Sequence, residues 1–304
     1  RLPFFVVLSL VSIFVVIGAA NAFWVIGLGT VLIGLCHLPV PFRLRLLLVI
    51  LAGAVLAVFR AGWMGAPWSN AVWPILGAMF MFRLIVYLYD VAHATAPFGP
   101  WRAFAYFFMV PNVCFPLFPV VDYQTFCRTY YNEDPFKIYQ VGIRWLVRGA
   151  FHLIIYRFVY QFLVVDPAEI VGAGSLFQHM TMTYLLYLRV SGLFHTIIGL
   201  LHLFGFNLPE THHHFFLAAS FTDFWRRINI YWKDFIMKIL FYPLYFKLRK
   251  LGNLQAMILA TLMAFSGTWF LHAYQWFWIR GAFLWTPQDV LFWLILALFV
   301  TGSV

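Results

Sequence analysis

Long apolar runs separated by short polar segments dominate this chain. Backbone groups in lipid must be paired within their own segment, so these runs predict helices. Several runs are shorter than the roughly 20 residues that a span needs, so some are expected to be tilted pairs or half-spans. The runs cover residues 4–19, 23–38, 44–58, 72–89, 104–121, 146–165, 176–204, 254–279 and 290–300.

Three stretches break this pattern. Residues 97–131 contain five prolines, too many for an uninterrupted helix. Residues 124–148 carry four basic residues against two acids, and residues 206–250 are the most polar part of the chain. Within the last stretch, residues 226–250 hold seven Lys or Arg and one acid among many aromatic residues. That mixture predicts helices that lie in the membrane interface or re-enter it.

The composition excludes a soluble fold. Of the 304 residues, 64% are hydrophobic and only 10% are charged, whereas soluble domains carry about 25% charged residues. The aromatic share of 21% suits lipid-facing surfaces and interface belts. We therefore expect an all-α polytopic membrane protein. It would form a single domain over residues 1–304, with roughly eight to ten transmembrane helices plus interfacial or re-entrant helices.

The net charge of +10 is better explained by the membrane than by nucleic acid. The basic residues lie mostly at the ends of apolar runs, where they set orientation and contact headgroups. The three cysteines, Cys36, Cys114 and Cys127, have no CxxC spacing. They are expected to be free thiols in apolar surroundings.

His272 is the first candidate for chemistry. An ionisable residue deep in an apolar helix is costly to bury and is a functional hypothesis by default. Trp269 and Trp276 lie three residues before it and four after it, on the same helical face. The alternative is a structural histidine hydrogen-bonded to a neighbouring helix.

The second candidate is the segment 220–232, where Ser220 or Thr222 can cap a helix. Asn229 follows two arginines and lies among Ile228, Ile230 and Trp232. The alternative is an amphipathic interfacial helix with one polar face.

Taken together, the two segments resemble the membrane-bound O-acyltransferase (MBOAT) family. In that family a Phe-Trp-x-Arg segment precedes an Asn, His or Asp, and a Trp-rich span about 40 residues later carries a His. Phe224-Trp225-Arg226-Arg227 fits the first element, and Asn229 and His272 fall on the two signature positions. The segment 107–112, with Pro119, Asp122 and Phe126, resembles an upstream Pro-bearing segment of the family, so the resemblance covers roughly residues 100–280.

This sequence also departs from the family pattern. Family members that modify bacterial wall polymers usually have His at the position of Asn229, and Trp-His-Gly where this chain has Leu271-His272-Ala273. Two valines replace a Gly-Pro pair before Asp122. These differences leave the subfamily and the acceptor open.

The resemblance implies an acyltransferase that moves an acetyl or other acyl group from a thioester such as acyl-CoA to a hydroxyl. The acceptor would be an envelope glycan, a glycolipid or a lipid. His272 would act as the base and Asn229 as a donor to the oxyanion or a guide for the acceptor. Other residues expected to bind substrate are Trp225, Arg226, Arg227, Trp232, Trp269, Gln275 and Trp276.

The expected location and partners follow from the same resemblance. We expect a multi-pass protein of the bacterial inner membrane, with membrane lipid, the acyl donor and the hydroxyl acceptor as partners. An extracytoplasmic partner protein is a further expectation from the family, and neither a bound cofactor nor a metal is expected. The alternative function is a non-enzymatic transporter or flippase of an envelope precursor, since charged residues occur in several spans.

The run His212-His213-His214 after Glu210 is a third candidate. Consecutive histidines point in different directions, whereas zinc sites usually need spaced ligands. We expect a polar loop at the membrane face, with metal binding as the alternative.

Overall fold

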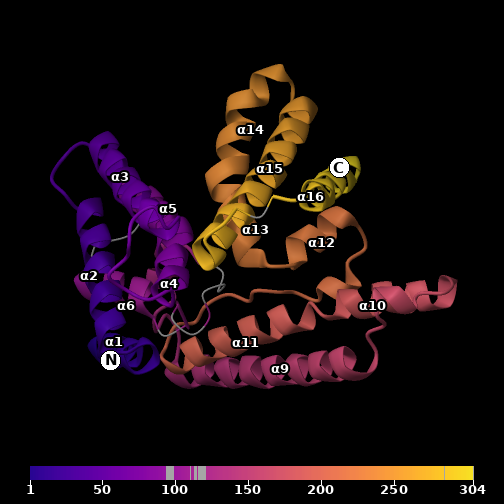
Figure 1. Cartoon of the computed structure of the whole chain (residues 1–304), viewed down its shortest axis with the longest axis horizontal. Helices are drawn as coiled ribbons and strands as arrows, with labels where there is room; N and C mark the ends of the chain where they lie inside the picture. The colour runs from indigo at the N-terminus through magenta and orange to yellow at the C-terminus, as the bar shows by residue number, and fades with distance from the viewer. Residues whose placement is uncertain (94–98, 110, 113–114, 116–120, 284, 304) are drawn as a thin grey trace. The chain divides into compact units, whose positions relative to one another are not determined.

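The computed structural model describes all residues except 94–98, 110, 113–114, 116–120, 284 and 304, and most of the described residues are in helices. Within them the only strand-like pairing is an isolated bridge, so the expected all-α class is confirmed (Figure 1). The chain forms two compact units. The first unit comprises Arg1–Cys127, Leu217–Arg226 and Tyr231–Val304, and the second comprises Arg128–Phe216 and Arg227–Ile230.

Three apolar helices open the first unit: α1 (Leu2–Ile17), α2 (Ala19–Cys36) and α3 (Phe42–Arg60). They pack in sequence order, α1 on α2 and α2 on α3. The end of α2 is held by Arg45, whose guanidinium donates to the Cys36 and Val40 carbonyls. That contact satisfies carbonyls that have no partner inside the helix.

A broken helix follows, made of α4 (Val72–Ala78), the π-helical turn η1 (Met79–Arg83) and α5 (Leu84–Ala92). Next, α6 (Pro100–Phe108) begins on a proline. The helix ends three residues before Pro111, because the residue preceding a proline is disfavoured in the helical region. The expected span 104–121 is therefore wrong as one helix over its described part.

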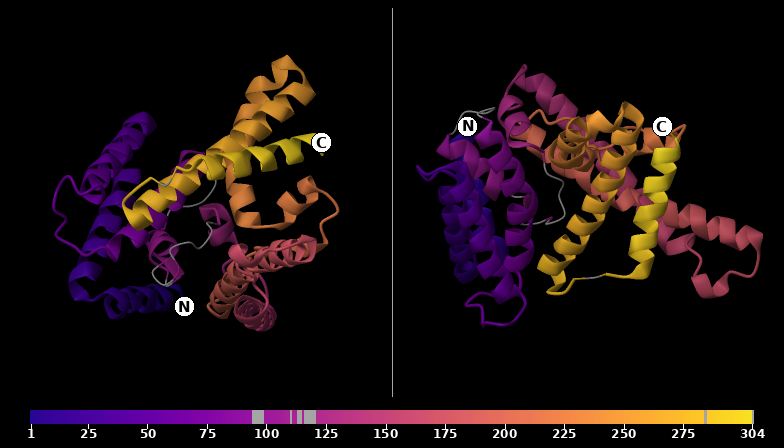
Figure 2. Two further views of the ribbon diagram at one scale, coloured as in Figure 1. Left: turned by 45° about the vertical axis from the view of Figure 1, so that its right-hand side comes forward. Right: turned by 90° about the horizontal axis from the view of Figure 1, so that it is seen from above.

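The C-terminal part of the first unit contains two long helices, α15 (Asn253–Arg280) and α16 (Pro287–Gly302), which lie side by side (Figure 2). Before them come short elements: α8 (Tyr123–Arg128), α12 (Phe221–Arg227), α13 (Ile230–Ile236), the π-helical turn η4 (Met237–Phe241), α14 (Tyr242–Leu248) and the 3-10 turn η5 (Arg249–Leu251). On its other side α15 packs against α4, where Gly77 lies against the Trp278 side chain. A Cβ at Gly77 would come within 2.5 Å of the Trp278 Cβ.

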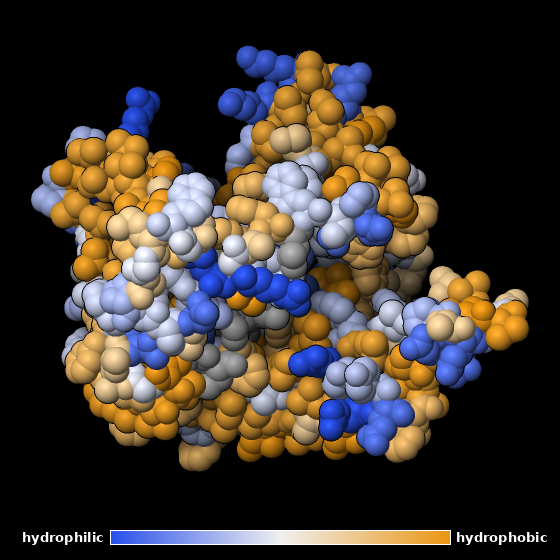
Figure 3. Space-filling model, in the orientation of Figure 1, coloured by the Kyte–Doolittle hydropathy of each residue, from blue (hydrophilic) through white to orange (hydrophobic). Residues whose placement is uncertain are grey.

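Among the residues that the structure describes, four helical segments are long and apolar enough to cross a membrane: α2, α3, α15 and the segment Ala173–Leu203. Two shorter apolar helices, α1 and α16, accompany them. Exposed hydrophobic side chains cover much of the face in Figure 3, as expected for surfaces that contact lipid. The chain is thus a helical membrane protein by length and composition, whereas the expected eight to ten spans remain a prediction.

The second unit is built on an antiparallel pair, α9 (Pro135–Phe162) and α11 (Leu188–Leu203), which run side by side in Figure 1. Between them lie the turn η2 (Pro167–Glu169) and α10 (Ala173–Leu185), and the turn η3 (Phe215–Leu217) follows α11 along the chain. The two helices touch through glycines. A Cβ at Gly142 would lie 2.9 Å from the Gly199 carbonyl oxygen, and one at Gly149 would lie 2.8 Å from that of Gly192. Such contact between helix backbones requires small residues.

The α9–α11 excursion is the segment between residues 131 and 205. Backbone hydrogen bonds join the chain just before it to the chain just after it. Tyr130 and Phe206 form the isolated antiparallel bridge. Beside it, the Tyr131 amide donates to the Gly205 carbonyl at 2.7 Å, and the Asn207 amide donates to the Thr129 carbonyl at 3.1 Å. The chain therefore enters and leaves the α9–α11 pair at one point.

Candidate functional site

His272 lies on α15 with its ring between two indoles. The ring centroids of His272 and Trp232 are 4.8 Å apart, and those of His272 and Trp293 are 5.1 Å apart, both in edge-on geometry. Trp232 comes from α13 and Trp293 from α16. Three elements of the first unit therefore meet at this imidazole.

Three buried polar atoms near this point have no hydrogen-bond partner within the described residues: His272 Nδ1, Trp232 Nε1 and Trp269 Nε1. Leaving such a group unpaired costs about 1–3 kcal/mol. Native structures pair nearly all buried polar groups, so each of these three atoms needs a partner that the described residues do not supply. Trp269 packs on Trp285 at 5.1 Å between centroids.

Trp225 joins the His272 surroundings to α12. Its ring lies 4.7 Å from that of Phe265, two turns before His272 on α15. Phe265 in turn lies 6.4 Å from Trp293, the second indole at His272. The structure thus connects Trp225, Trp232 and His272 through one aromatic cluster.

The remaining expected residues have other surroundings. Gln275 is half-buried on α15, and Trp276 is partly exposed, with the Arg280 guanidinium 4.6 Å from its ring. Arg226 is exposed. The carbonyl of Arg227 accepts a hydrogen bond from the His213 amide at 2.9 Å.

The start of α12 has the predicted cap. Ser220 Oγ accepts from the Asp223 amide at 3.1 Å, and Asp223 Oδ2 accepts from the Ala219 amide at 3.1 Å. Thr222, the other candidate cap, instead shares a hydrogen bond with Ser303 Oγ at 2.6 Å. Ser220 therefore starts the helix that carries Trp225 and Arg226.

Asn229 occupies the turn between α12 and α13, and it groups with the second unit. Its backbone is left-handed, with φ at 41°, a conformation that Asn adopts more readily than most residues. The next amide, of Ile230, donates to the Thr211 carbonyl at 2.8 Å. Asn229 Oδ1 is buried without a hydrogen-bond partner within the described residues. Its predicted pairing with His272 stays a prediction.

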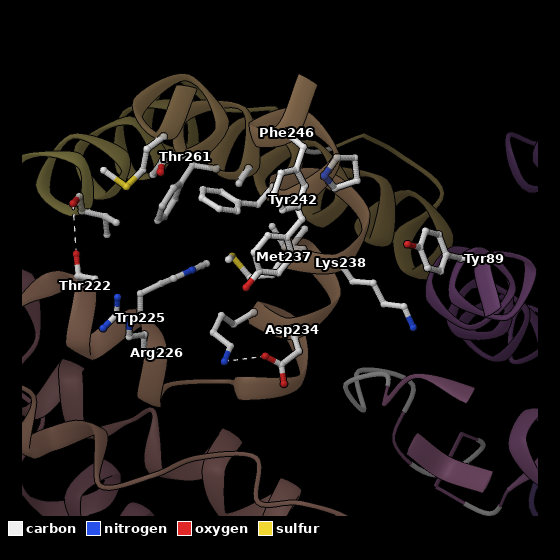
Figure 4. Close-up of a pocket in the computed structure, with 18 residues that line it drawn as sticks. Tyr89, Thr222, Trp225, Arg226, Asp234, Met237, Lys238, Tyr242, Phe246 and Thr261 are labelled. Atoms are coloured by element: carbon white, nitrogen blue, oxygen red, sulfur yellow. Dashed lines mark hydrogen bonds and ion pairs between the residues drawn. The ribbon is translucent and has the colours of Figure 1, made fainter. Parts of the chain in front are cut away.

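A pocket of about 800 Å³ opens between α12, α13, η4, α14 and α15 (Figure 4). Tyr242, Phe246 and Thr261 lie on one side, whereas Trp225, Arg226 and Asp234 lie on the other. The wall formed by α14 and α15 is mostly apolar, and the basic residues come from α12, α13 and η4. Because Phe265 also lines this pocket, it adjoins the aromatic cluster at His272.

Lys238, on the pocket wall, was missed by the sequence reasoning. Its Nζ lies 2.5 Å from Oδ1 of Asp90, whose side chain is fully buried, and 3.6 Å from Asp122 Oδ1. The Gln124 amide also donates to Asp90 Oδ2 at 3.0 Å. A lysine inside the apolar run 235–241 was the available signal. Its partners are far away in sequence and follow no local spacing.

The three consecutive histidines differ in burial. His212 is buried, with Nε2 3.2 Å from the Tyr187 hydroxyl, and burial lowers its pKa well below the usual value. His213 and His214 are exposed, and His213 Nδ1 lies 2.6 Å from Glu210. No group of three or more potential metal ligands occurs among the described residues.

No protein-family model matches the chain, and no curated protein matches it significantly.

Two substitutions separate the backbone role of Asn229 from its amide. Asn229→Ala is expected to lose about 1 kcal/mol of stability, because Ala is strained in the left-handed conformation. Asn229→Gly is expected to keep the stability, since Gly adopts that conformation freely. Thermal unfolding of both variants checks this. Equal stability of the Ala variant and the wild type would contradict it.

Proposed function

We propose that this chain is an MBOAT-type acyltransferase embedded in the membrane. It moves an acyl group from a thioester such as acyl-CoA to a hydroxyl on an envelope glycan, a glycolipid or a lipid. The observation that carries the proposal is His272, a histidine on a membrane helix with an unpaired buried Nδ1 among indoles. The order of motifs along the sequence supports it.

The reaction fits a neutral imidazole. The acceptor hydroxyl oxygen attacks the thioester carbon, and His272 takes the hydroxyl proton. The tetrahedral intermediate then expels the thiolate as the C–S bond breaks, and the proton passes to sulfur. The products are an ester and a free thiol. In this proposal the Asn229 amide donates to the oxyanion or orients the acceptor.

The surroundings of His272 suit such a transfer. The indoles of Trp232 and Trp293 limit the access of water, which would otherwise hydrolyse the donor. The adjoining pocket offers an apolar wall for an acyl chain. Arg226 on the rim attracts an anionic donor, whereas the charge of Lys233 is paired with Asp234 at 2.7 Å.

The test measures free CoA released by the purified protein from acetyl-CoA and longer acyl-CoAs, with and without a cell-envelope extract as acceptor. We expect release that depends on the acceptor, and the acyl series would report the chain length that the pocket accepts. If a stable, monodisperse protein releases no CoA from any donor, the proposal that acyl-CoA is the donor is wrong. Precursor translocation by the same protein in vesicles would then favour the transporter.

A further inference from the structure

The outer face of α9 combines an apolar stripe with basic borders. The stripe lies three or four residues apart along the helix, so its members share one face. Each side chain is 54–67% exposed, and together they form a continuous apolar surface of the kind that contacts a partner or a membrane. The stripe consists of Ile143, Val147, Phe151, Ile154, Phe158 and Phe162.

The opposite face of α9 is already occupied. Gly142 and Gly149 bring it against the backbone of α11. At 3.6 residues per turn, the stripe falls on the other side of the helix from these glycines. The stripe is therefore the outer surface of the α9–α11 pair. The lower margin of Figure 3, where α9 lies in Figure 1, is largely hydrophobic.

The charges on α9 all have one sign. The helix carries Lys137, Arg144, Arg148 and Arg157 and no acid. By helical position, Arg144 and Arg148 border the stripe on one side and Arg157 borders it on the other. Long basic side chains beside an apolar face are typical of a helix in the interface of an anionic membrane.

The same basic residues argue against a spanning α9. Arg148 and Arg157 are separated by eight residues, which cover about 12 Å of helix against about 30 Å of hydrocarbon. The sequence prediction of a span over 146–165 placed both arginines inside the membrane. α9 is not among the segments apolar enough to cross.

The apolar character of α11 also has an explanation without lipid. Of the most apolar stretch within Ala173–Leu203, 50% is buried inside the protein, compared with 17% for α3 and 33% for α2 and α15. Ser191, His195 and His202 on α11 are fully or almost fully buried. Much of this segment is therefore apolar because protein covers it.

We propose that α9 lies along the surface of an anionic phospholipid bilayer. Its apolar stripe reaches the boundary between headgroups and acyl chains, and its basic borders contact the phosphates. α11 packs on the face of α9 that points away from the lipid. This assignment is independent of the chemistry at His272.

Depth measurements along α9 test the proposal on the full-length protein in vesicles. Spin labels are attached singly at positions 143, 147, 151, 154 and 158 in a background with all three cysteines replaced by Ala. Collision with oxygen and with a water-soluble nickel complex then reports each depth. We expect one shallow depth for all five positions. Labels at exposed positions 47, 51 and 55 of α3 are the control, and there the middle label should be deepest.

Lipid charge provides the second arm. Adding phosphatidylglycerol to phosphatidylcholine vesicles is expected to draw the α9 labels deeper. Arg144→Gln combined with Arg157→Gln should at least halve that shift, whereas replacement of both by Lys should preserve it. A deepest point near position 151 would show a spanning helix. Immobile labels with little oxygen contact would show a protein partner on the stripe, and labels that collide mainly with nickel would show water. Each of these results overturns the proposal.

Photo-reactive phospholipids test the same proposal without cysteine replacement. The test therefore remains possible if the cysteine-free protein fails to fold. In the wild-type protein, peptides of α9 should crosslink to a probe near the glycerol backbone and not to one at the chain end. Peptides of α3 should crosslink to both. Crosslinks from α9 to the chain-end probe would overturn the proposal.

Discussion

His272→Ala is expected to lower acceptor-dependent CoA release by about 10²–10⁴-fold, the usual contribution of a general base. The imidazole is the proton acceptor in the proposed step, and among described residues no other histidine contacts the Trp232–Trp293 cluster. His272→Gln should lose as much activity, because an amide fills the space but takes no proton. The measurement is the rate of CoA release under saturating donor.

Met263→Ala is the matched control for this truncation. Met263 lies on the same helix and is 52% exposed, so its loss should leave the rate near that of the wild type. Full activity of a well-folded His272→Ala protein would refute His272 as the base. It would not refute acyl transfer, which the wild-type assay tests separately. If the His272→Ala protein does not fold, the His272→Gln variant tests the same assignment.

Gly149→Ala is expected to destabilise the second unit by about 2 kcal/mol. The new Cβ would meet Thr196 Oγ1 at 2.5 Å, and the Gly192 carbonyl oxygen and the Thr196 amide nitrogen at 2.8 Å each. Overpacking of this kind costs about 1–3 kcal/mol, and the cost here is at the upper end of that range because two of the three atoms belong to the backbone. The better helix propensity of Ala returns about 1 kcal/mol.

Thermal unfolding followed by far-UV circular dichroism measures this effect in detergent. Gly174→Ala is the control, since a Cβ at Gly174 in α10 meets nothing within 4 Å. That variant should be as stable as the wild type or slightly more stable. Equal midpoints for the two variants would mean that α9 and α11 are further apart than these contacts indicate.

The long helices could be predicted from the sequence because a long apolar run in lipid must pair its backbone groups within the run, which a helix does. The span expected over 254–279 is observed as α15, Asn253–Arg280. The start of α9 was missed, although Asp134 and Pro135 form an N-cap and first-turn pair that signals a helix start. The predicted helix began only at Leu146, because the prediction followed hydropathy and did not use this capping signal.

The contacts of the candidate site could be predicted only in part. Helical spacing predicted that Trp269 and His272 share a face, and Trp232 was selected for its place in a motif. Trp293 was missed because nothing in the local pattern of α16 relates it to α15. The Lys238–Asp90 pair joins residues 148 positions apart, and such a pairing depends on tertiary packing that local periodicity does not encode.

The closed base of the α9–α11 excursion has a consequence for modularity. Because the Tyr130–Phe206 bridge already brings the two chain ends together, a short turn can replace the intervening residues without stretching the connection, and the entropy of closing a short loop is small. Insertions are tolerated where the chain ends that receive them lie close together. The length of the α9–α11 pair is therefore not fixed by its connection to the rest of the chain, so homologues are expected to differ in the length of this segment.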